Sequence, residues 1–403
     1  MTIVSEYQRA NAAGGKRLYP SKSESCESVA DESDASDALA RQLRVAIISD
    51  SAPERNGVGS YYVDLAAQLS TRVQRVEMIS PTIRHGAWQA GLVFSLPGDP
   101  TQKLCMPNPF SMRRQLNSLR PHLVIIATPG VYGLCGAFLA SRMGIPAIAG
   151  FHTSFERLTE LYWNKSVTGK LVHGYFRVSN SYLFRKCQRV LANSNDMVAQ
   201  AKRLGGRNVC LITTGISPVF SNFPITPFRG EVKKVLFAGR LAPEKNIQAI
   251  LDAAEKMPDL HFTLAGDGPL MSQVSQAQSR LSNVHCLGWI DRQCLRQQID
   301  EHDLLVLPSH FESFGTIALE AMARQRLVLV SDDCGIAHWP EFREGLSVFR
   351  QGAFFEALTR LCRQSSGARH RQAQKALHMT RALNDKNLQQ WCKLMLELVT
   401  PET

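Results

Sequence analysis

The sequence predicts an α/β protein built from two doubly wound, Rossmann-like domains that face a central cleft. The chain has 403 residues, more than one hydrophobic core of ordinary size organises. Two series of apolar runs of strand length alternate with longer amphipathic segments, as buried parallel strands and their covering helices do. The stretch SNFPITPFRG separates the two series near residue 222. Together these observations favour two α/β domains over one large domain.

Four segments follow from this pattern. Residues 1–42 are rich in Ser, Asp, Glu and Ala and are expected to form a disordered tail. An N-terminal domain is expected over 43–222 and a C-terminal domain over 223–384. Residues 385–403 contain an amphipathic pattern and are predicted to form a helix that crosses back to the N-terminal domain.

The predicted elements of each domain come in alternating order. In the first series RVAIIS, PHLVIIATP and IPAIAGF are strands, and VDLAAQLS and GAFLASRMG are helices. In the second series KVLFAGR, LHFTLAG, DLLVLPS and LVLVSD are strands, and IQAILDAAEKM and TIALEAMARQ are helices. Because ligands bind at the carboxyl ends of strands in such sheets, the cleft between the domains is the expected site.

Composition and charge narrow the functional classes. No run of eighteen apolar residues is present, and the start of the chain lacks the apolar core of a secretory signal, so a cytoplasmic protein is expected. Ten cysteines without a C-x-x-C pair suit reduced thiols, and we expect no metal site and no cofactor. Residues 101–220 hold 15 Lys and Arg against three acidic residues, a surplus of twelve that attracts phosphates or an anionic surface.

The segment LLVLPSHFESFGTIALEAMA carries the most informative pattern. A strand ends before Glu312, a helix is predicted to open around Ser313, Phe314 and Gly315, and Glu320 lies two turns into it. Backbone amides at a helix start bind phosphate or sugar oxygens, and flanking carboxylates accept hydrogen bonds from vicinal hydroxyls. Taken singly, these glutamates would be ordinary surface charges, so the neighbouring loops decide the interpretation.

Three further loops follow predicted strands of the same domain. In KVLFAGRLAPEKN, Arg240 and Lys245 are two cations that suit a diphosphate. Glycine turns after the next two strands leave room beside the backbone. The residues of these loops are Gly239, Arg240, Lys245, Gly266, Asp267, Gly268, Gly288 and Trp289.

These residues resemble the family-4 glycosyltransferases, a retaining group with the GT-B fold, over roughly residues 43–400. The glutamate pair matches Glu312 and Glu320, the G-R-L-x-x-E-K-N loop matches 239–246, and the G-D-G turn matches 266–268. The resemblance implies that Arg240 and Lys245 hold the diphosphate and Glu312 the donor sugar. It implies further that Glu320 binds the ribose and that Gly288 and Trp289 lie beside the base.

The N-terminal half resembles the acceptor-side domain of the same family. ISDSAPERNGVGSYYVDLAAQL is similar to its first strand and glycine loop, with Gly57 and Gly59 toward the donor phosphates. His152 and Thr153 match the His-Thr pair that faces the donor sugar, which makes Glu312, His152, Arg240 and Lys245 the predicted catalytic set.

The chain also departs from the family pattern beyond Glu320. Gln325 and Leu327 stand where a small residue, Gly and Pro are usual, and Gly335 lacks its usual glycine partner. These departures bear on donor preference rather than on the glutamates.

The resemblance implies metal-independent transfer of a hexosyl group, with retention, from a nucleotide-diphosphate sugar to a lipid or saccharide acceptor. The N-terminal domain is most similar to mannosyl- and sulfoquinovosyl-transferring members. The segment 163–190 mixes aromatic and basic residues, which favours a peripheral position on the inner face of the cell membrane. The same mixture also suits a helix with core aromatics and solvated cations.

Other functions are also compatible with the sequence. A sugar-nucleotide epimerase shares the fold, and a non-catalytic nucleotide-sugar or nucleic-acid binding protein would use similar loops or charge. No nucleic-acid partner is expected, because no known nucleic-acid-binding module accompanies the basic segment.

Overall fold

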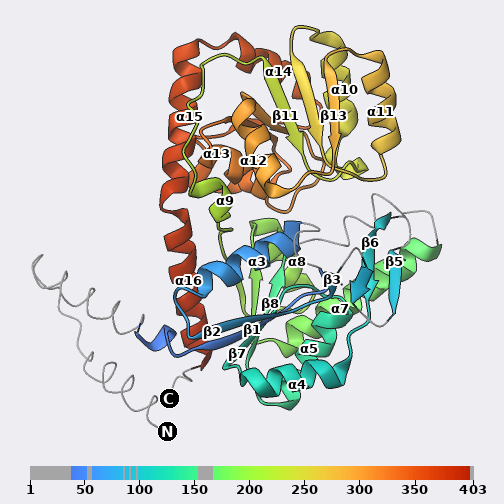
Figure 1. Ribbon diagram of the computed structural model, residues 1–403, viewed down its shortest axis with the longest axis vertical. Coiled ribbons are helices and arrows are strands. Elements are labelled where there is room, and N and C mark those ends of the chain that lie inside the picture. The colour runs from blue at the N-terminus through green and yellow to red at the C-terminus, as the bar shows by residue number, and fades with distance from the viewer. Residues whose placement is uncertain are drawn as a thin grey trace, which may run out of the picture.

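The computed structural model describes residues 38–51, 57–84, 87–89, 92–96, 99–152 and 167–399. Figure 1 shows two α/β domains, each built on a six-stranded parallel sheet with helices on both faces. The predicted class of two doubly wound domains is therefore confirmed. The first 37 residues of the predicted tail, together with Thr153, lie outside the described residues.

The N-terminal sheet has the strand order β10-β9-β8-β7-β1-β2. Its strands are β1 (Arg44–Ile48), β2 (Arg75–Ile79), β7 (Leu123–Ile126), β8 (Ala147–Phe151), β9 (Arg189–Ala192) and β10 (Val209–Leu211). The helices of this domain are α3 (Gly57–Leu69), α4 (Pro109–Leu119), α5 (Val131–Arg142), α7 (Val167–Lys186) and α8 (Asn195–Arg203). Two antiparallel pairs join β3 (Thr82–Arg84) to β4 (Ala87–Gln89) and β5 (Val93–Leu96) to β6 (Asp99–Cys105). Ala40 and Leu43 are buried in the core of this domain, so its packing begins before β1.

The C-terminal sheet has the order β13-β12-β11-β14-β15-β16. Its strands are β11 (Lys234–Ala238), β12 (His261–Ala265), β13 (Val284–Gly288), β14 (Leu304–Leu307), β15 (Leu327–Ser331) and β16 (Ser347–Phe349). Its helices are η1 (Pro243–Lys245), α10 (Ile247–Lys256), α11 (Met271–Arg280), α12 (Arg292–Glu301), α13 (Thr316–Ala323), η2 (Gly335–His338), η3 (Pro340–Phe342), α14 (Phe354–Arg363) and α15 (Ser366–Arg381). The strand order reverses between β11 and β14, and ligands of doubly wound sheets bind at such a switch point.

Within the part of the chain that the structure describes, the backbone crosses between the domains twice. Ile212 belongs to the N-terminal core and Ile216 to the C-terminal core, so the first crossing lies between them. The second crossing runs into α16 (Leu383–Val399). The side-chain amide of Asn384 joins the two crossings, because it accepts from the Ile216 backbone N–H at 2.6 Å and donates to its carbonyl at 2.9 Å.

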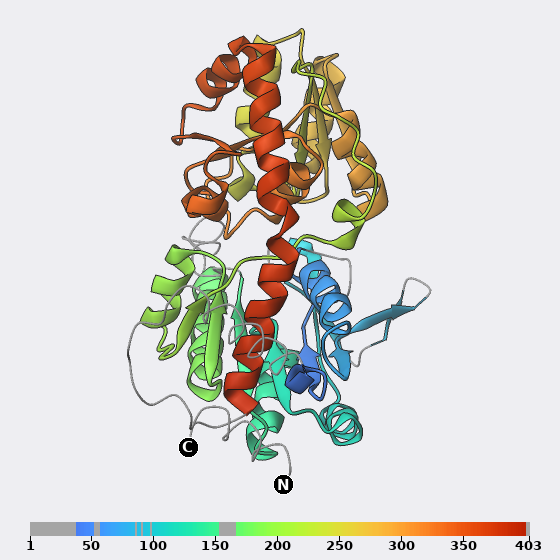
Figure 2. The ribbon, with the colours of Figure 1, turned by 90° about the vertical axis from the view of Figure 1, so that its left-hand side faces the viewer.

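The C-terminal helix completes the N-terminal domain. Figure 2 shows α15 and α16 as a red helical column that runs along both domains. Trp391 and Met395 of α16 are fully buried in the core that β1 and α3 also form. The two domains are thus tied by backbone at two points, the second of which leads into a helix that packs against both cores.

Two buried arginines hold the segment that follows the first crossing. Arg324 is fully buried; its guanidinium donates to Asp300 at 2.7 and 2.8 Å and to the Phe223 carbonyl at 2.8 Å. Arg326 donates to the Thr226 carbonyl at 2.7 Å. These arginines flank Gln325, where the sequence departs from the family pattern, so this altered stretch anchors the interdomain segment.

Candidate functional site

The loops after β11, β12 and β13 are joined into one surface by backbone hydrogen bonds. The N–H of Gly239 donates to the Ala265 carbonyl at 2.9 Å, and the N–H of Gly266 donates to the Gly288 carbonyl at 2.8 Å. A Cβ on Gly266 would lie 1.8 Å from the Gly239 carbonyl oxygen. Only glycine therefore fits at this position, which explains the predicted turn in terms of packing between loops.

The same surface continues through Asp267 and Gly268. The N–H of Leu241 donates to the Asp267 carbonyl at 2.9 Å, and the carboxylate of Asp267 accepts from the N–H of Gly268 at 2.7 Å. Trp289, directly after β13, remains 59% exposed despite its size. An exposed indole beside these loops offers a flat face on which a nucleotide base can stack.

Lys245 and Glu312 form an ion pair at the switch point of the C-terminal sheet. Lys245 follows β11 and Glu312 follows β14, the two neighbouring strands at which the order reverses. Both side chains are largely shielded, at 15% and 21% exposure. Burial opposes the charge on Lys245, but the facing Glu312 carboxylate holds the pKa of Lys245 above its usual value. The site therefore contains a cation and a carboxylate that accepts hydrogen bonds, side by side in a partly desolvated position.

Arg240 lies on the same loop as Lys245 and pairs with Glu244, whose charge also acts on Lys245. Its guanidinium is 3.8 Å from the carboxylate of Glu244, which is only 5% exposed. The backbone carbonyl of Glu244 accepts from the N–H of His310 at 2.8 Å, so the loop after β11 is fixed to the loop after β14. The two predicted diphosphate-binding cations thus lie on one loop, which the loop after β14 holds in place.

The loop that carries Glu312 is held on both sides. Phe311 is buried in the core of the N-terminal domain, although it belongs to the C-terminal half of the chain. The carbonyl of Glu312 accepts from the N–H of Gly335 at 2.9 Å, and a Cβ on Gly335 would lie 2.0 Å from the Ser313 carbonyl oxygen. Glu312 therefore lies where the two domains meet.

The start of α13 differs in detail from the predicted helix start. Gly315, with φ of 94°, is the N-cap, and the helix begins at Thr316. The side chain of Phe314 is only 1% exposed and belongs to the C-terminal core, so only its backbone can reach a ligand. Ser313 is also buried, at 9% exposure. Amides and hydroxyl, rather than the aromatic ring, are the groups that this segment offers.

Glu320 meets a partner that the sequence analysis did not single out. Arg292, the first residue of α12, lies 3.3 Å from Glu320 and 2.5 Å from Asp64 of the N-terminal domain. Burial raises the pKa of Glu320 to about 7, and the Arg292 charge opposes this shift. The sequence signals for the missed residues are weak: a cation three residues after Trp289, and the acidic residue within α3.

The N-terminal half of the site centres on His152 at the end of β8. Its Nε2 and the Tyr62 hydroxyl share a hydrogen bond of 2.8 Å, and Tyr61 packs against the same imidazole with ring centroids 5.1 Å apart. Burial lowers the pKa of His152 to about 4, so the ring is neutral at pH 7. His152 can therefore contribute a hydrogen bond but not a positive charge. Neither tyrosine was identified from the sequence.

The two predicted glycines of the N-terminal domain occupy different environments. Gly57 opens α3 and a Cβ there would meet open space, whereas Gly59 is buried within the helix. Residues 52–56, which precede them, lie outside the described residues, as does Thr153. Tyr62 of α3 contacts His152, so this helix reaches the N-terminal part of the site.

The switch point of the N-terminal sheet is already filled by Asp50. This carboxylate follows β1 and accepts from the Thr128 hydroxyl at 2.7 Å and from the Tyr132 N–H at 2.7 Å, the latter at the start of α5. Burial raises the pKa of Asp50, while these hydrogen bonds oppose the rise. The start of α5 therefore has its negative partner within the chain.

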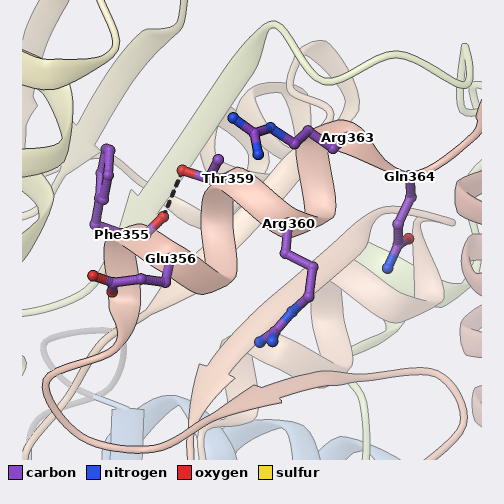
Figure 3. Close-up of a pocket in the computed structure, with 6 residues that line it drawn as sticks. All are labelled: Phe355, Glu356, Thr359, Arg360, Arg363 and Gln364. Carbon is purple, nitrogen blue, oxygen red and sulfur yellow. Dashed lines mark hydrogen bonds between the residues drawn. The ribbon is translucent and has the colours of Figure 1, made fainter.

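A surface hollow on the C-terminal domain lies apart from these loops. Figure 3 shows a surface hollow on α14, lined by Phe355, Glu356, Thr359, Arg360, Arg363 and Gln364. None of the predicted site residues lines it. Within the described ranges, no group of His, Cys, Asp and Glu is arranged to hold a metal ion, and no helix is long and apolar enough to cross a bilayer.

Two family models match the chain in tandem. The model described as Glycosyltransferase Family 4 matches residues 55–220, and the model described as Glycosyl transferases group 1 matches residues 232–364. The first match falls on the N-terminal domain and the second on the loops described above.

Known relatives give the same result. The chain is 25% identical to a GDP-mannose-dependent alpha-mannosyltransferase of Corynebacterium glutamicum over 71% of each protein. It is 24% identical to the sulfoquinovosyl transferase SQD2 of Arabidopsis thaliana, over 61% of this chain and 50% of that protein. The match to a glycosyltransferase of Bacillus subtilis, YqgM, likewise spans only 56% of that protein.

A solved structure matches over nearly the whole fold. Anabaena HepE in complex with UDP and glucose superposes with a TM-score of 0.66 at 18% identity, covering 89% of this chain and all of that one. The tandem family models and the two Rossmann-like domains lead to one conclusion: the chain has the GT-B fold, with a Glycosyltransferase Family 4 domain followed by a Glycosyl transferases group 1 domain.

Proposed function

We propose that this protein transfers a hexosyl group from a nucleotide-diphosphate sugar to a lipid or saccharide acceptor, with retention of anomeric configuration and without a metal ion. The observation that carries the proposal is the Lys245–Glu312 pair at the switch point, with Arg240 on the same loop as Lys245. A diphosphate needs cations and a sugar needs hydrogen-bond acceptors, and these groups supply both in a partly desolvated position.

The roles of the residues follow from their chemistry. Arg240 and Lys245 stabilise the negative charge that grows on the diphosphate as the bond from its oxygen to the anomeric carbon breaks. Glu312 accepts hydrogen bonds from the sugar hydroxyls, and Glu320 those from the ribose. The acceptor oxygen forms its bond on the face that the diphosphate leaves, and the departing phosphate takes the acceptor proton. Two protein cations take the place that a metal would fill.

Relatives guide the choice of donor. The Corynebacterium protein is named for GDP-mannose and the Arabidopsis protein for sulfoquinovosyl transfer, and HepE was solved with UDP. A thermal-shift panel of UDP-, GDP- and ADP-sugars therefore tests the donor, repeated with Glu312→Ala and Arg240→Ala. One donor class is expected to raise the Tm of the native protein, with a smaller shift in both variants. If no nucleotide sugar raises the Tm, the proposal loses its basis.

Retention and metal independence need separate measurements. With the donor identified, NMR of the product in the first minutes of reaction gives its anomeric configuration, which is expected to equal that of the donor. Activity in excess EDTA is expected to match activity in Mg²⁺. An inverted product or loss of activity in EDTA would overturn the corresponding part of the proposal.

The proposed membrane surface lies on α7 and differs from the one expected from the aromatic residues. Phe176 and Phe184 are buried, at 4% and 3% exposure. In their place Leu171 and Val178 are 70% and 69% exposed, with Tyr175 between them at 37%. These positions recur at helical spacing on one face, and Lys170 and Arg177 beside them are also exposed. An exposed apolar stripe with adjacent cations fits an anionic lipid surface.

Vesicle sedimentation tests this surface. The native protein is expected to sediment with vesicles of phosphatidylglycerol and phosphatidylcholine, but not with phosphatidylcholine alone. Leu171→Asp with Val178→Asp is expected to abolish sedimentation, whereas Val348→Asp, at a 40% exposed position of the other domain, leaves it unchanged. Equal recovery of all three proteins in the supernatant would reject a membrane role for α7.

A further inference from the structure

Arg292 connects groups from both domains. Its guanidinium donates through one nitrogen to Asp64 on α3 at 2.5 Å and through the other to Glu320 on α13 at 3.3 Å. The three side chains are 22%, 17% and 9% exposed, so the contacts are shielded from solvent. A planar guanidinium can bind two carboxylates at once, which a lysine ammonium does with less directional control.

We refer to Asp64, Arg292 and Glu320 as the bridge. The first crossing between the domains also contacts it. The other oxygen of Asp64 accepts from the Ser217 hydroxyl at 3.0 Å, and Ser217 directly follows the first crossing. The Arg292 guanidinium lies 5.6 Å from the ring centroid of Phe220, within the next helix of the connector, α9 (Pro218–Ser221). The bridge therefore joins the N-terminal domain, the crossing and the C-terminal domain.

The two arms of the bridge are unequal in length. Charge-assisted hydrogen bonds of this kind are typically about 2.7–2.9 Å long, so the arm to Asp64 is tight and the arm to Glu320 is stretched. Asp64 thus holds Arg292 back from Glu320. This leaves Glu320 close enough to a cation to be stabilised as a carboxylate, yet able to accept hydrogen bonds from a ligand.

We propose that Arg292 is a positioning residue that couples nucleoside diphosphate binding to the spacing of the two domains. The inference rests on the proposed function, in which Glu320 accepts the ribose hydroxyls. A shift of α3 relative to α12 changes how strongly Arg292 pairs with Glu320 and so changes the affinity of Glu320 for ribose. By linkage, ribose binding changes the interdomain geometry by the same free energy.

Two measurements on the full chain test the coupling. The first is the affinity for UDP, GDP and ADP by titration calorimetry, and the second is hydrogen exchange of the crossing at residues 212–217 without nucleotide. Arg292→Gln is expected to weaken the preferred nucleotide about 10-fold and to speed exchange in the crossing. Asp64→Asn is also expected to weaken nucleotide binding and to speed exchange in the crossing. Binding weakens because Arg292, released from Asp64, pairs tightly with Glu320 and competes with ribose.

A double mutant isolates the interaction between the two residues. Asp64→Asn combined with Arg292→Gln is expected to weaken binding by less than the product of the single effects, since both changes break the same bridge. Arg280→Gln is the matched control. It removes one arginine from an exposed pair with Glu255 within one domain and is expected to change neither readout.

The outcomes separate this inference from the proposed function. If Glu320→Gln weakens nucleotide binding but Arg292→Gln and Asp64→Asn do not, the coupling is rejected and the donor site stands. If Glu320→Gln binds nucleotide like the native protein, the proposed ribose role fails. The hydrogen-exchange measurement then still tests whether Arg292 and Asp64 stabilise the crossing. Unchanged exchange at 212–217 in both single variants overturns that role.

Discussion

The two sheets of this chain present different groups at equivalent switch points. In the C-terminal sheet the loops after β11 and β14 hold Lys245 against Glu312, a pair that a charged ligand can engage. In the N-terminal sheet Asp50 follows β1 and bonds Thr128 and the start of α5, so the helix has an internal partner. The same sheet topology can therefore be left open for a ligand or closed by a side chain.

The two halves of the site also differ in charge: the C-terminal half presents charged groups and the N-terminal half a neutral one. The C-terminal half presents Arg240 and Lys245 with their carboxylates, whereas the N-terminal half contributes a neutral His152 fixed by Tyr62. A diphosphate is charged whatever sugar it carries, while an acceptor hydroxyl is not. The C-terminal half is therefore suited to the constant part of the donor and the N-terminal half to uncharged groups.

Neutralising the Glu312 carboxylate at the C-terminal switch point is expected to have the largest effect on transfer. Glu312→Gln is expected to lower the transfer rate about 10²- to 10³-fold, because Lys245 loses its partner and the donor sugar loses a charged acceptor. Initial rates at saturating donor measure the effect. Glu344→Gln, which alters an exposed pair with Lys375, serves as the control and is expected to leave the rate unchanged. A rate for Glu312→Gln within threefold of native would contradict the assignment.

The loop packing of the C-terminal half can be disturbed without touching a charge. Gly266→Ala places a Cβ 1.8 Å from the Gly239 carbonyl oxygen, at a residue with φ of 148°. The loops must separate, and the free energy of unfolding is expected to fall by about 1–3 kcal/mol together with nucleotide affinity. Gly174→Ala within α7 meets no atom within 4 Å and is expected to stabilise the protein slightly. Urea denaturation compares the two, and equal stabilities would refute the packing argument.

The neutral state of His152 predicts a pH dependence from the N-terminal half. Its folded pKa of about 4 lies below the usual 6.5, so the unfolded chain binds more protons between these values. Stability contributed by His152 is therefore complete above pH 6.5 and decreases as the pH falls toward 4, with a loss of about 2 kcal/mol by pH 5. Urea denaturation at pH 7.5 and 5 measures this decrease. His152→Gln is expected to show a smaller decrease, and an identical one would mean that His152 is not buried in neutral form.

A smaller effect concerns the exposed rim of the C-terminal half. Trp289→Ala is expected to weaken nucleotide binding about 10-fold through loss of base stacking, with little change in Tm because the indole is 59% exposed. Phe110→Ala removes an 83% exposed aromatic from the N-terminal domain and controls for loss of surface ring area. Equal nucleotide affinity in Trp289→Ala and the native protein would place the base elsewhere.

Local patterns made the fold and the C-terminal loops predictable. Strand-length apolar runs and glycine turns are read within a few residues, so the two sheets and the loops at Gly239, Gly266 and Glu312 follow from sequence. Contacts between distant segments were missed for the opposite reason. Asp64 and Arg292 are 228 residues apart and Tyr62 and His152 are 90 apart, and no local pattern joins such pairs.

Burial was the other quantity that the sequence did not reveal. The mixed aromatic and basic stretch predicted a surface from its composition, but Phe176 and Phe184 face the core while Leu171 and Val178 face outward. Phe314 was assigned to the site for its backbone amide alone, and the burial of its ring in the core was not predicted. Helical spacing identifies which residues share a face, whereas the neighbouring elements decide which face is covered.

The course of α16 has a consequence for synthesis on the ribosome. The N-terminal domain is translated first, yet its core includes Trp391 and Met395 from the last helix. Until those residues emerge, the nascent domain exposes the apolar surface that α16 later covers, and such surface promotes association between unfinished chains. The half of the protein that is made first is therefore finished last, after the C-terminal sheet has been translated in full.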